Sequence, residues 1–213
     1  MGARILSDKL IARVSILRFV CSLLAAAAIV PPAFADQAGA VDPPAESRIR
    51  FGKGTIEVSV LGGGALPVST FHAKSDHQLA MASFAIGRIM FAGTGGNFEL
   101  LVDVTPFVQI RQPNPVRGWS LAPLFLRWNF PAIGGTAHVF AEGSGSLLFT
   151  NDPVRTTTSN FLEQAGFGVR FAEGRRRAWL VGYRFQHISN GGRIQPNPGA
   201  NFNLVYLGLS FIR

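Results

Sequence analysis

This chain is strongly apolar, yet beyond residue 35 it contains no run of 18 or more apolar residues. Its mean hydropathy is +0.25, and only 15% of its residues are charged. A membrane-spanning helix requires about 20 consecutive apolar residues. An apolar exported chain without such helices can still cross a bilayer if its strands close into a barrel, because closure pairs every backbone group. The sequence therefore favours an all-β fold, a transmembrane β-barrel of the outer-membrane type.

The N-terminal segment has the layout of a secretory signal. Several basic residues precede a short apolar run at 19–30, and a small-x-small sequence ends at Ala35. Such a segment is removed on export. We expect residues 1–35 to be a signal peptide, with cleavage before Asp36.

The rest of the chain is expected to form one domain. Residues 36–49 are rich in Ala, Pro and acidic residues and are expected to be a flexible lead-in, followed by the barrel at 50–213. The single cysteine, Cys21, lies inside the expected signal peptide, so disulfides and thiol chemistry are excluded from the exported part. The basic residues are scattered and no nucleic-acid motif is present. The positive charge suits anionic lipid or polysaccharide better than nucleic acid.

Eight stretches of strand character follow the lead-in, each about 10–14 residues long, as a tilted membrane strand requires. Tight turns alternate with longer connections, and this alternation places the longer loops on the extracellular side. An even strand count with this alternation indicates an eight-stranded antiparallel barrel. The expected strands are residues 50–62, 79–92, 97–107, 120–130, 136–149, 160–172, 176–189 and 201–213.

Apolar and polar residues alternate within most of these stretches, although the second alternates poorly and Pro123 interrupts the fourth. If the apolar face meets lipid, four acids and three arginines point into the lumen, which an eight-stranded barrel fills with side chains. A conducting pore is therefore not expected. A soluble secreted barrel or sandwich, with the apolar face as core, is the alternative. The expected lumen charges are Glu57, Glu99, Asp103, Glu142, Arg127, Arg170 and Arg184.

A polar tip ends the seventh stretch. Residues two apart in a strand share a face, so His187 and Ser189 lie on the outer face with Tyr183 and Phe185. Their Cα atoms are about 6.5–7 Å apart at this spacing, which lets the side chains meet. A serine becomes a useful nucleophile next to a histidine base. His-x-Ser alone is a weak signal, and such a pair is more often a polar patch.

The longer run around this pair resembles the lipid A 3-O-deacylase family (PagL). The resemblance rests on His187-Ile188-Ser189-Asn190-Gly191-Gly192, followed by Gln195-Pro196-Asn197 before the last strand. Members of that family are eight-stranded outer-membrane barrels that hydrolyse an ester-linked acyl chain of lipid A. The resemblance implies that Ser189 is the nucleophile and His187 the base, with Asn190 and the Gly192 backbone as the oxyanion hole.

One position departs from the family pattern. The third member of the family's triad is a glutamate, and Asn201 occupies that position here. Pairing of the last two strands is expected to place Asn201 opposite Ser189 and Asn203 opposite His187. The Asn201 carbonyl would then orient the imidazole, as asparagine does in Cys-His-Asn sites. Glu163 is the alternative source of a carboxylate. With Asn201 as the residue that orients the imidazole, Asn201→Glu should leave activity intact or raise it.

The sequence thus predicts an outer-membrane serine esterase acting on lipid A or lipopolysaccharide, with its active-site end extracellular. Substrate contacts are expected from Arg193, Phe185 and Tyr183, because guanidinium suits phosphate and aromatic rings suit acyl chains. The remaining histidines show no metal-ligand spacing, and no cofactor or metal is expected. The alternative from another class is a catalytically inactive structural or adhesive small barrel.

Overall fold

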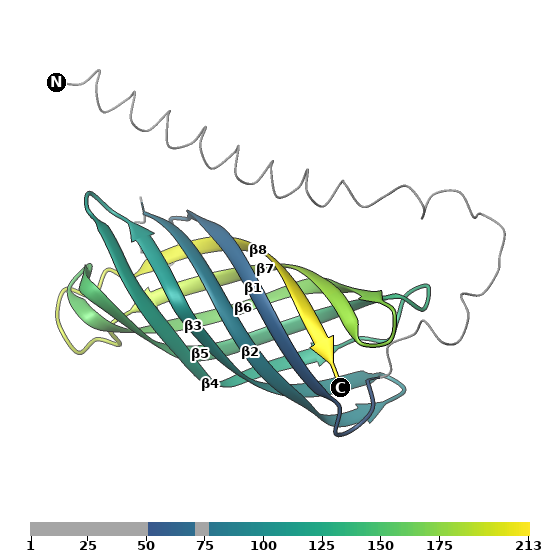
Figure 1. Cartoon of the computed structure of the whole chain (residues 1–213). Helices are drawn as coiled ribbons and strands as arrows, with labels where there is room; N and C mark the ends of the chain where they lie inside the picture. The colour runs from purple at the N-terminus through teal and green to yellow at the C-terminus, as the bar shows by residue number, and fades with distance from the viewer. Residues whose placement is uncertain (1–50, 71–76) are drawn as a thin grey trace, which may run out of the picture. The chain divides into compact units, whose positions relative to one another are not determined.

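A computed structural model describes residues 51–70 and 77–213, and these residues form a closed antiparallel barrel (Figure 1). The expected signal peptide and lead-in lie outside the described residues. The described part of the chain contains no helix long and apolar enough to cross a membrane. The strands are β1 (Ile56–Pro67), β2 (Gln78–Gly93), β3 (Gly96–Arg111), β4 (Pro115–Asn129), β5 (Ala137–Val154), β6 (Thr157–Glu173), β7 (Arg177–Ser189) and β8 (Ala200–Ile212).

Each strand pairs with its sequence neighbour, and β8 pairs with β1 to close the sheet. Figure 1 shows β8 lying beside β1, so the two ends of the folded chain meet in the wall. The register runs from Glu57 opposite Ile212 to Pro67 opposite Phe202. Because closure leaves no unpaired strand edge, every strand can face lipid. The expected fold class is confirmed.

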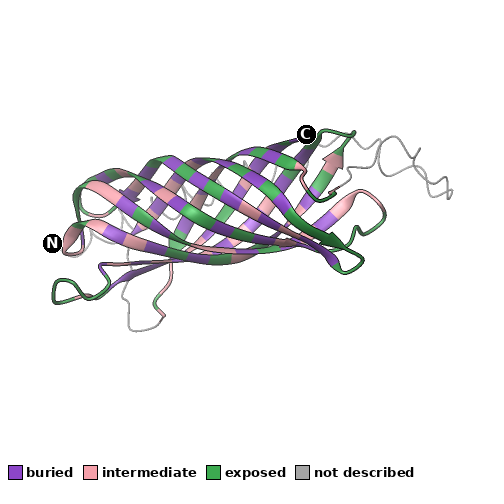
Figure 2. Cartoon of the chain, turned by 90° about the horizontal axis from the view of Figure 1, so that it is seen from below, coloured by how far each residue is buried: buried purple, intermediate pink, exposed green. Residues whose placement is uncertain are grey.

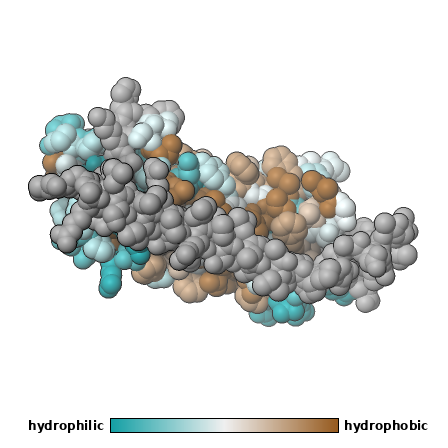
Figure 3. Space-filling model, turned by 90° about the horizontal axis from the view of Figure 1, so that it is seen from above, coloured by the Kyte–Doolittle hydropathy of each residue, from teal (hydrophilic) through white to brown (hydrophobic). Residues whose placement is uncertain are grey.

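Burial alternates residue by residue along the strands, as the banding in Figure 2 shows. Figure 3 shows apolar side chains gathered on the visible barrel wall, with polar side chains toward its ends. Large apolar residues such as Phe84 and Phe167 are more than half exposed on the outside. The second strand, which alternates poorly in sequence, alternates regularly in burial because small residues and glycine occupy several of its positions. All seven expected lumen charges are buried.

Six of the seven lumen charges form one connected network, and the seventh, Asp103, accepts hydrogen bonds from Ser83 and Thr105. The Glu142 carboxylate accepts hydrogen bonds from Arg184 Nε at 2.7 Å, from Arg127 Nε at 3.1 Å and from Tyr206 Oη at 2.6 Å. Arg127 also contacts Glu57 at 3.1 Å, and Arg170 donates to Glu57 from the neighbouring side. Burying these charges is tolerated because Glu57, Glu99 and Glu142 each lie beside arginines.

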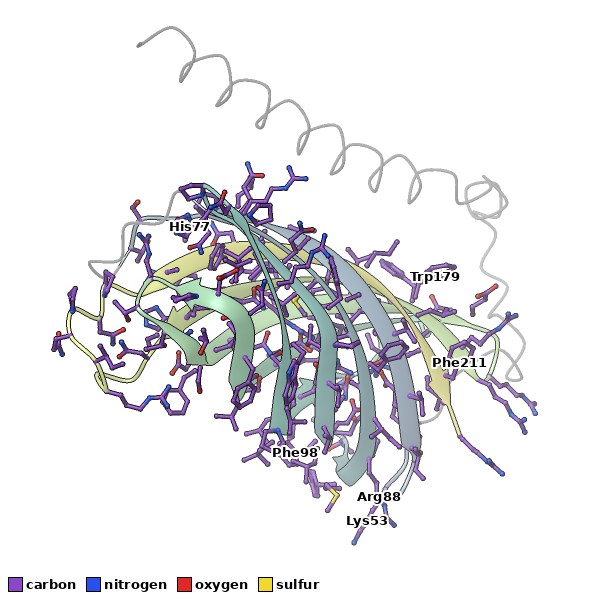
Figure 4. The ribbon with its side chains drawn as sticks, turned by 60° about the vertical axis from the view of Figure 1, so that its left-hand side comes forward. Lys53, His77, Arg88, Phe98, Trp179 and Phe211 are labelled. Carbon is purple, nitrogen blue, oxygen red and sulfur yellow. The ribbon has the colours of Figure 1, made fainter. Side chains whose placement is uncertain are left out.

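The two ends of the barrel are marked by different labelled residues. Figure 4 shows Lys53 and Arg88 together at one end and His77 at the other. Near the Lys53 end, Trp179 and Phe211 are exposed on the outer face. Exposed aromatics at this level are typical of the girdle at a bilayer interface. The opposite end, where β7 ends and β8 begins, is called the site end below.

Two prolines inside strands are accommodated by irregular pairing. The register between β4 and β5 shifts between Leu121 and Leu124, where Pro123 lies. The register between β3 and β4 shifts between Thr105 and Val108, where Pro106 lies. A β-bulge leaves a residue out of the ladder, so the missing N–H of proline does not break a hydrogen bond.

The strands at the site end differ from the expected boundaries. The first strand is expected to end at residue 62, but β1 continues through Gly63 and Gly64 to Pro67. A Cβ on Gly63 would lie 2.5 Å from the Val205 carbonyl oxygen, so glycine allows β1 and β8 to approach. The connections after the expected strands at 97–107 and 136–149 are shorter than expected, because pairing continues to Arg111 opposite Pro115 and to Val154 opposite Thr157.

Candidate active site

The polar tip of β7 lies between β6 and β8 on the outer face. His187 is opposite Glu163 on β6 and opposite Asn201 on β8. The expected pairing of Asn201 with Ser189 is therefore wrong by two residues, and Phe185 rather than His187 faces Asn203. The loop between the strands turns one residue earlier than its sequence suggests. This register brings Asn201 directly to the imidazole.

Asn201 contacts the imidazole and the end of β1 at the same time. Its side-chain oxygen lies 2.5 Å from His187 Nδ1, and its Nδ2 donates to the Thr70 carbonyl at 2.5 Å. The backbone carbonyl of Asn201 also accepts a hydrogen bond from the Val68 N–H at 3.1 Å. Although its position faces outward, Asn201 is 0% exposed. The residues after β1 therefore complete the site from the other side of the barrel seam.

The His187 ring fits where Gly199 has no side chain. A Cβ on Gly199 would lie 2.8 Å from Cε1 of His187, and Gly199 has a φ of +62°. That φ is unfavourable for most residues. Glycine at position 199 thus allows the positive φ of the loop and leaves room for the imidazole ring.

Ser189 shares the outer face with His187 and is half-buried. Within residues 51–70 and 77–213, the Ser189 hydroxyl forms no hydrogen bond to His187. In substrate-free enzymes such bonds are often long and tighten only in the complex. The positions nevertheless suit a nucleophile and base, because the Nδ1 side of the imidazole is held and Nε2 remains for a proton transfer.

Asn190 has a different position from the expected one. Its Nδ2 donates to Thr156 Oγ1 at 2.9 Å and to the Ile194 carbonyl at 2.7 Å, and its backbone N–H donates to Asn197 Oδ1 at 3.1 Å. The side chain is 1% exposed. Residue 190 has the parity of the lumen-facing residues, and its amide holds the β7–β8 loop.

Gly191 and Gly192 both have positive φ, +66° and +76°. Gly192 is exposed, and a Cβ built there would meet no atom within 4 Å. Glycine allows a substrate to approach the backbone closely. Asn190 and the Gly192 backbone are the two expected oxyanion-hole donors. Of these, the Gly192 N–H is the one with open space around it.

A family model for the lipid A 3-O-deacylase (PagL) matches residues 87–210, which include β3 to β7 and most of β8. The chain belongs to this family. Among solved structures, it is similar to the outer membrane enzyme PagL, with 18% identity, 71% of this chain and 97% of that chain covered, and a TM-score of 0.57. It is also similar to Neisserial surface protein A, with 12% identity, 74% and 95% coverage, and a TM-score of 0.51. A search of curated proteins found no match.

In this member of the lipid A 3-O-deacylase family, the expected substrate contacts have differing partners. Arg193 donates to the Ser159 carbonyl at 2.6 Å and to the Asn190 carbonyl at 2.8 Å, and its guanidinium lies 5.1 Å from the Phe161 ring centroid. These contacts hold the loop, which leaves Arg193 fewer donors for a phosphate. Tyr183 donates to Asn203 Oδ1 at 2.7 Å, on the same outer face as Phe185.

The Glu163 carboxylate lies opposite His187 but is exposed. Among the described residues, no hydrogen bond or ion pair joins it to His187. Glu163→Gln should therefore change the rate of lipid A deacylation by less than about threefold, since an exposed charge contributes little to a neighbour. Initial rates of fatty-acid release from lipid A vesicles would measure this. A loss larger than tenfold would make Glu163, not Asn201, the partner of the imidazole.

Two residues of the site were not found from the sequence of this lipid A 3-O-deacylase family member. Thr70 acts through its backbone carbonyl, and a carbonyl carries no sequence signal. Gly199 was read only as a loop residue, although a glycine directly before the last strand is a signal of positive φ or of close packing. Both become visible once β1, β7 and β8 are placed side by side.

Proposed function

We propose that this chain is an outer-membrane serine esterase that hydrolyses the ester-linked 3-O acyl chain of lipid A. The observation that carries the proposal is the His187–Asn201 pair on the outer face of β7 and β8, two residues from Ser189. A soluble esterase places its nucleophile in a cleft. Here the serine and histidine lie on the outer face of the barrel, within reach of a lipid in the membrane.

The chemistry follows from the held imidazole. Ser189 Oγ attacks the ester carbonyl carbon while His187 Nε2 accepts the serine proton. Asn201 accepts the Nδ1–H and keeps the ring in place. The oxyanion accepts a hydrogen bond from the Gly192 N–H. Asn190 supports that donor by holding the loop. His187 then returns the proton to the leaving sugar hydroxyl, and an acyl-serine remains. Water releases the acyl chain by the same proton transfers in reverse order.

The location follows from the same arrangement. We place the site end at the extracellular leaflet, where lipid A resides, and the Lys53 end in the periplasm. Residues 1–35 would direct export and be removed. Tyr183 and Phe185 continue the outer face from His187 toward the middle of the barrel wall, so they are positioned to contact an acyl chain. The substrate partner is thus a lipid A or lipopolysaccharide molecule in the membrane.

The test is mass spectrometry of lipid A from outer membranes that contain the wild type or Ser189→Ala at equal folded abundance. Loss of one hydroxyacyl mass with the wild type alone would support the proposal, and the remaining acyl pattern would identify the position cut. Unchanged lipid A in both samples, with the barrel inserted, would contradict it. That result would favour an inactive structural or adhesive barrel in which Asn201 has replaced the acid of an earlier enzyme.

A further inference from the structure

Asn201 is fully buried although its strand position faces outward. The cause is the segment after β1, whose Val68 N–H and Thr70 carbonyl both bond to Asn201. The imidazole partner is thus covered on one side by backbone from residues 68–70, directly after β1. The inference that follows rests on the proposed function and concerns how a neutral residue serves at this position.

The Thr70 carbonyl decides which way the Asn201 amide points. A carbonyl oxygen only accepts hydrogen bonds, so the amide atom beside it must be the NH2 group. The amide oxygen is then left beside His187 Nδ1. An amide oxygen also only accepts, so Nδ1 must carry the proton and Nε2 the lone pair. The assignment of the amide follows from its hydrogen-bond partners alone, as such assignments should.

We propose that the Thr70 carbonyl is a positioning group for catalysis. Through the Asn201 amide it fixes His187 in the Nδ1–H tautomer, which leaves Nε2 as the base toward Ser189. The chain Thr70 C=O, Asn201 amide and His187 imidazole is called the relay below. The relay explains how this chain uses an asparagine at the position where the family resemblance places a glutamate.

The relay reverses the expectation that a carboxylate at 201 would preserve or raise activity. A carboxylate can accept the Nδ1–H, but its second oxygen would face the Thr70 carbonyl with no proton between two acceptors. A carbonyl that loses its donor and faces a second acceptor is destabilised. Aspartate has the size of asparagine, so Asn201→Asp isolates this effect. Glutamate adds a methylene in a fully buried position and should do worse.

The first measurement is the tautomer of the His187 imidazole. Nitrogen-15 NMR of the full-length folded barrel in lipid nanodiscs distinguishes Nδ1–H from Nε2–H, and the His187 signal is assigned by its loss in His187→Gln. The relay predicts the Nδ1–H tautomer in the wild type. In Asn201→Leu, which lacks both the amide oxygen and the NH2 group, it predicts a mixture of the two tautomers. Nε2–H in the wild type would overturn the proposal, because Nδ1 would then be an acceptor facing an acceptor.

The second measurement is the rate of deacylation. Asn201→Asp should lower kcat by about tenfold or more with KM unchanged, since repulsion between the carboxylate and the Thr70 carbonyl shifts the side chain that holds the catalytic histidine, and this acts on the chemical step. An Asn201→Asp variant as active as the wild type would overturn the role of Thr70. An inactive wild type with the Nδ1–H tautomer would refute the proposed function and leave the relay in place. An active wild type with the Nε2–H tautomer would support the proposed function and refute the relay.

Discussion

Ser189→Ala should reduce lipid A deacylation by about a thousandfold or more, while the barrel remains folded. The hydroxyl is the only atom group removed, and without it the acyl-serine cannot form. Members of a nucleophile–base pair act as a unit, so His187→Ala should have an effect of similar size. The double variant should be no slower than either single variant. Rates of fatty-acid release, with KM determined separately, measure these effects.

Ser159→Ala is the matched control for the loss of a serine hydroxyl. Ser159 is half-buried on β6, and its contact with Arg193 uses the backbone carbonyl, which alanine retains. We expect near wild-type rates from this variant. Residual activity of Ser189→Ala within tenfold of the wild type would mean that another group attacks the ester, and the proposed mechanism would be wrong.

Glu142→Gln should lower the free energy of unfolding by about 3–5 kcal/mol, because it removes the charge that two buried arginines share. Arg184 and Arg127 both bond to this carboxylate, and Tyr206 donates to it. The amide that replaces it brings an NH2 group against guanidinium donors. Unfolding by guanidinium chloride in lipid vesicles, followed by tryptophan fluorescence, measures the change.

The control for this prediction is an acid outside the lumen. Glu173 lies 3.9 Å from Arg177, and both side chains are more than half exposed, so Glu173→Gln should change stability by less than about 0.5 kcal/mol. Adding Arg184→Gln to Glu142→Gln should recover part of the loss, since the second change removes one unpaired charge. Equal effects of the two glutamate variants would show that the lumen network does not stabilise the barrel.

The sequence predicted the two faces of the barrel well because side chains alternate with a period of two. That period fixed the lumen position of Glu142 and the outer position of His187 without any knowledge of strand pairing. The same rule, applied to Asn190, would have placed its side chain on the lumen side. The family resemblance assigned it to the oxyanion hole, whereas in the structure its amide donates to Thr156 and to the Ile194 carbonyl.

Strand register was harder to predict than parity. A long loop joins β7 to β8, and its length does not fix which residues pair. The resulting error of two residues kept Asn201 on the correct face but moved it from His187 to Ser189. The Thr70 contact could not be predicted at all, because it depends on closure between the first and last strands. Backbone groups take part in such contacts whatever side chain they carry.

Closure of the seam between β1 and β8 links maturation to activity. Ser189 and His187 are present as soon as the β6–β7 hairpin forms, but their relay is assembled from opposite ends of the chain, with Asn201 on β8 and Thr70 beyond β1. In a sheet that has not yet closed, His187 and Ser189 are therefore present without the Asn201 and Thr70 contacts. On the proposed mechanism, the site is complete only when β8 pairs with β1, so a barrel that has not yet closed would not hydrolyse the lipids around it.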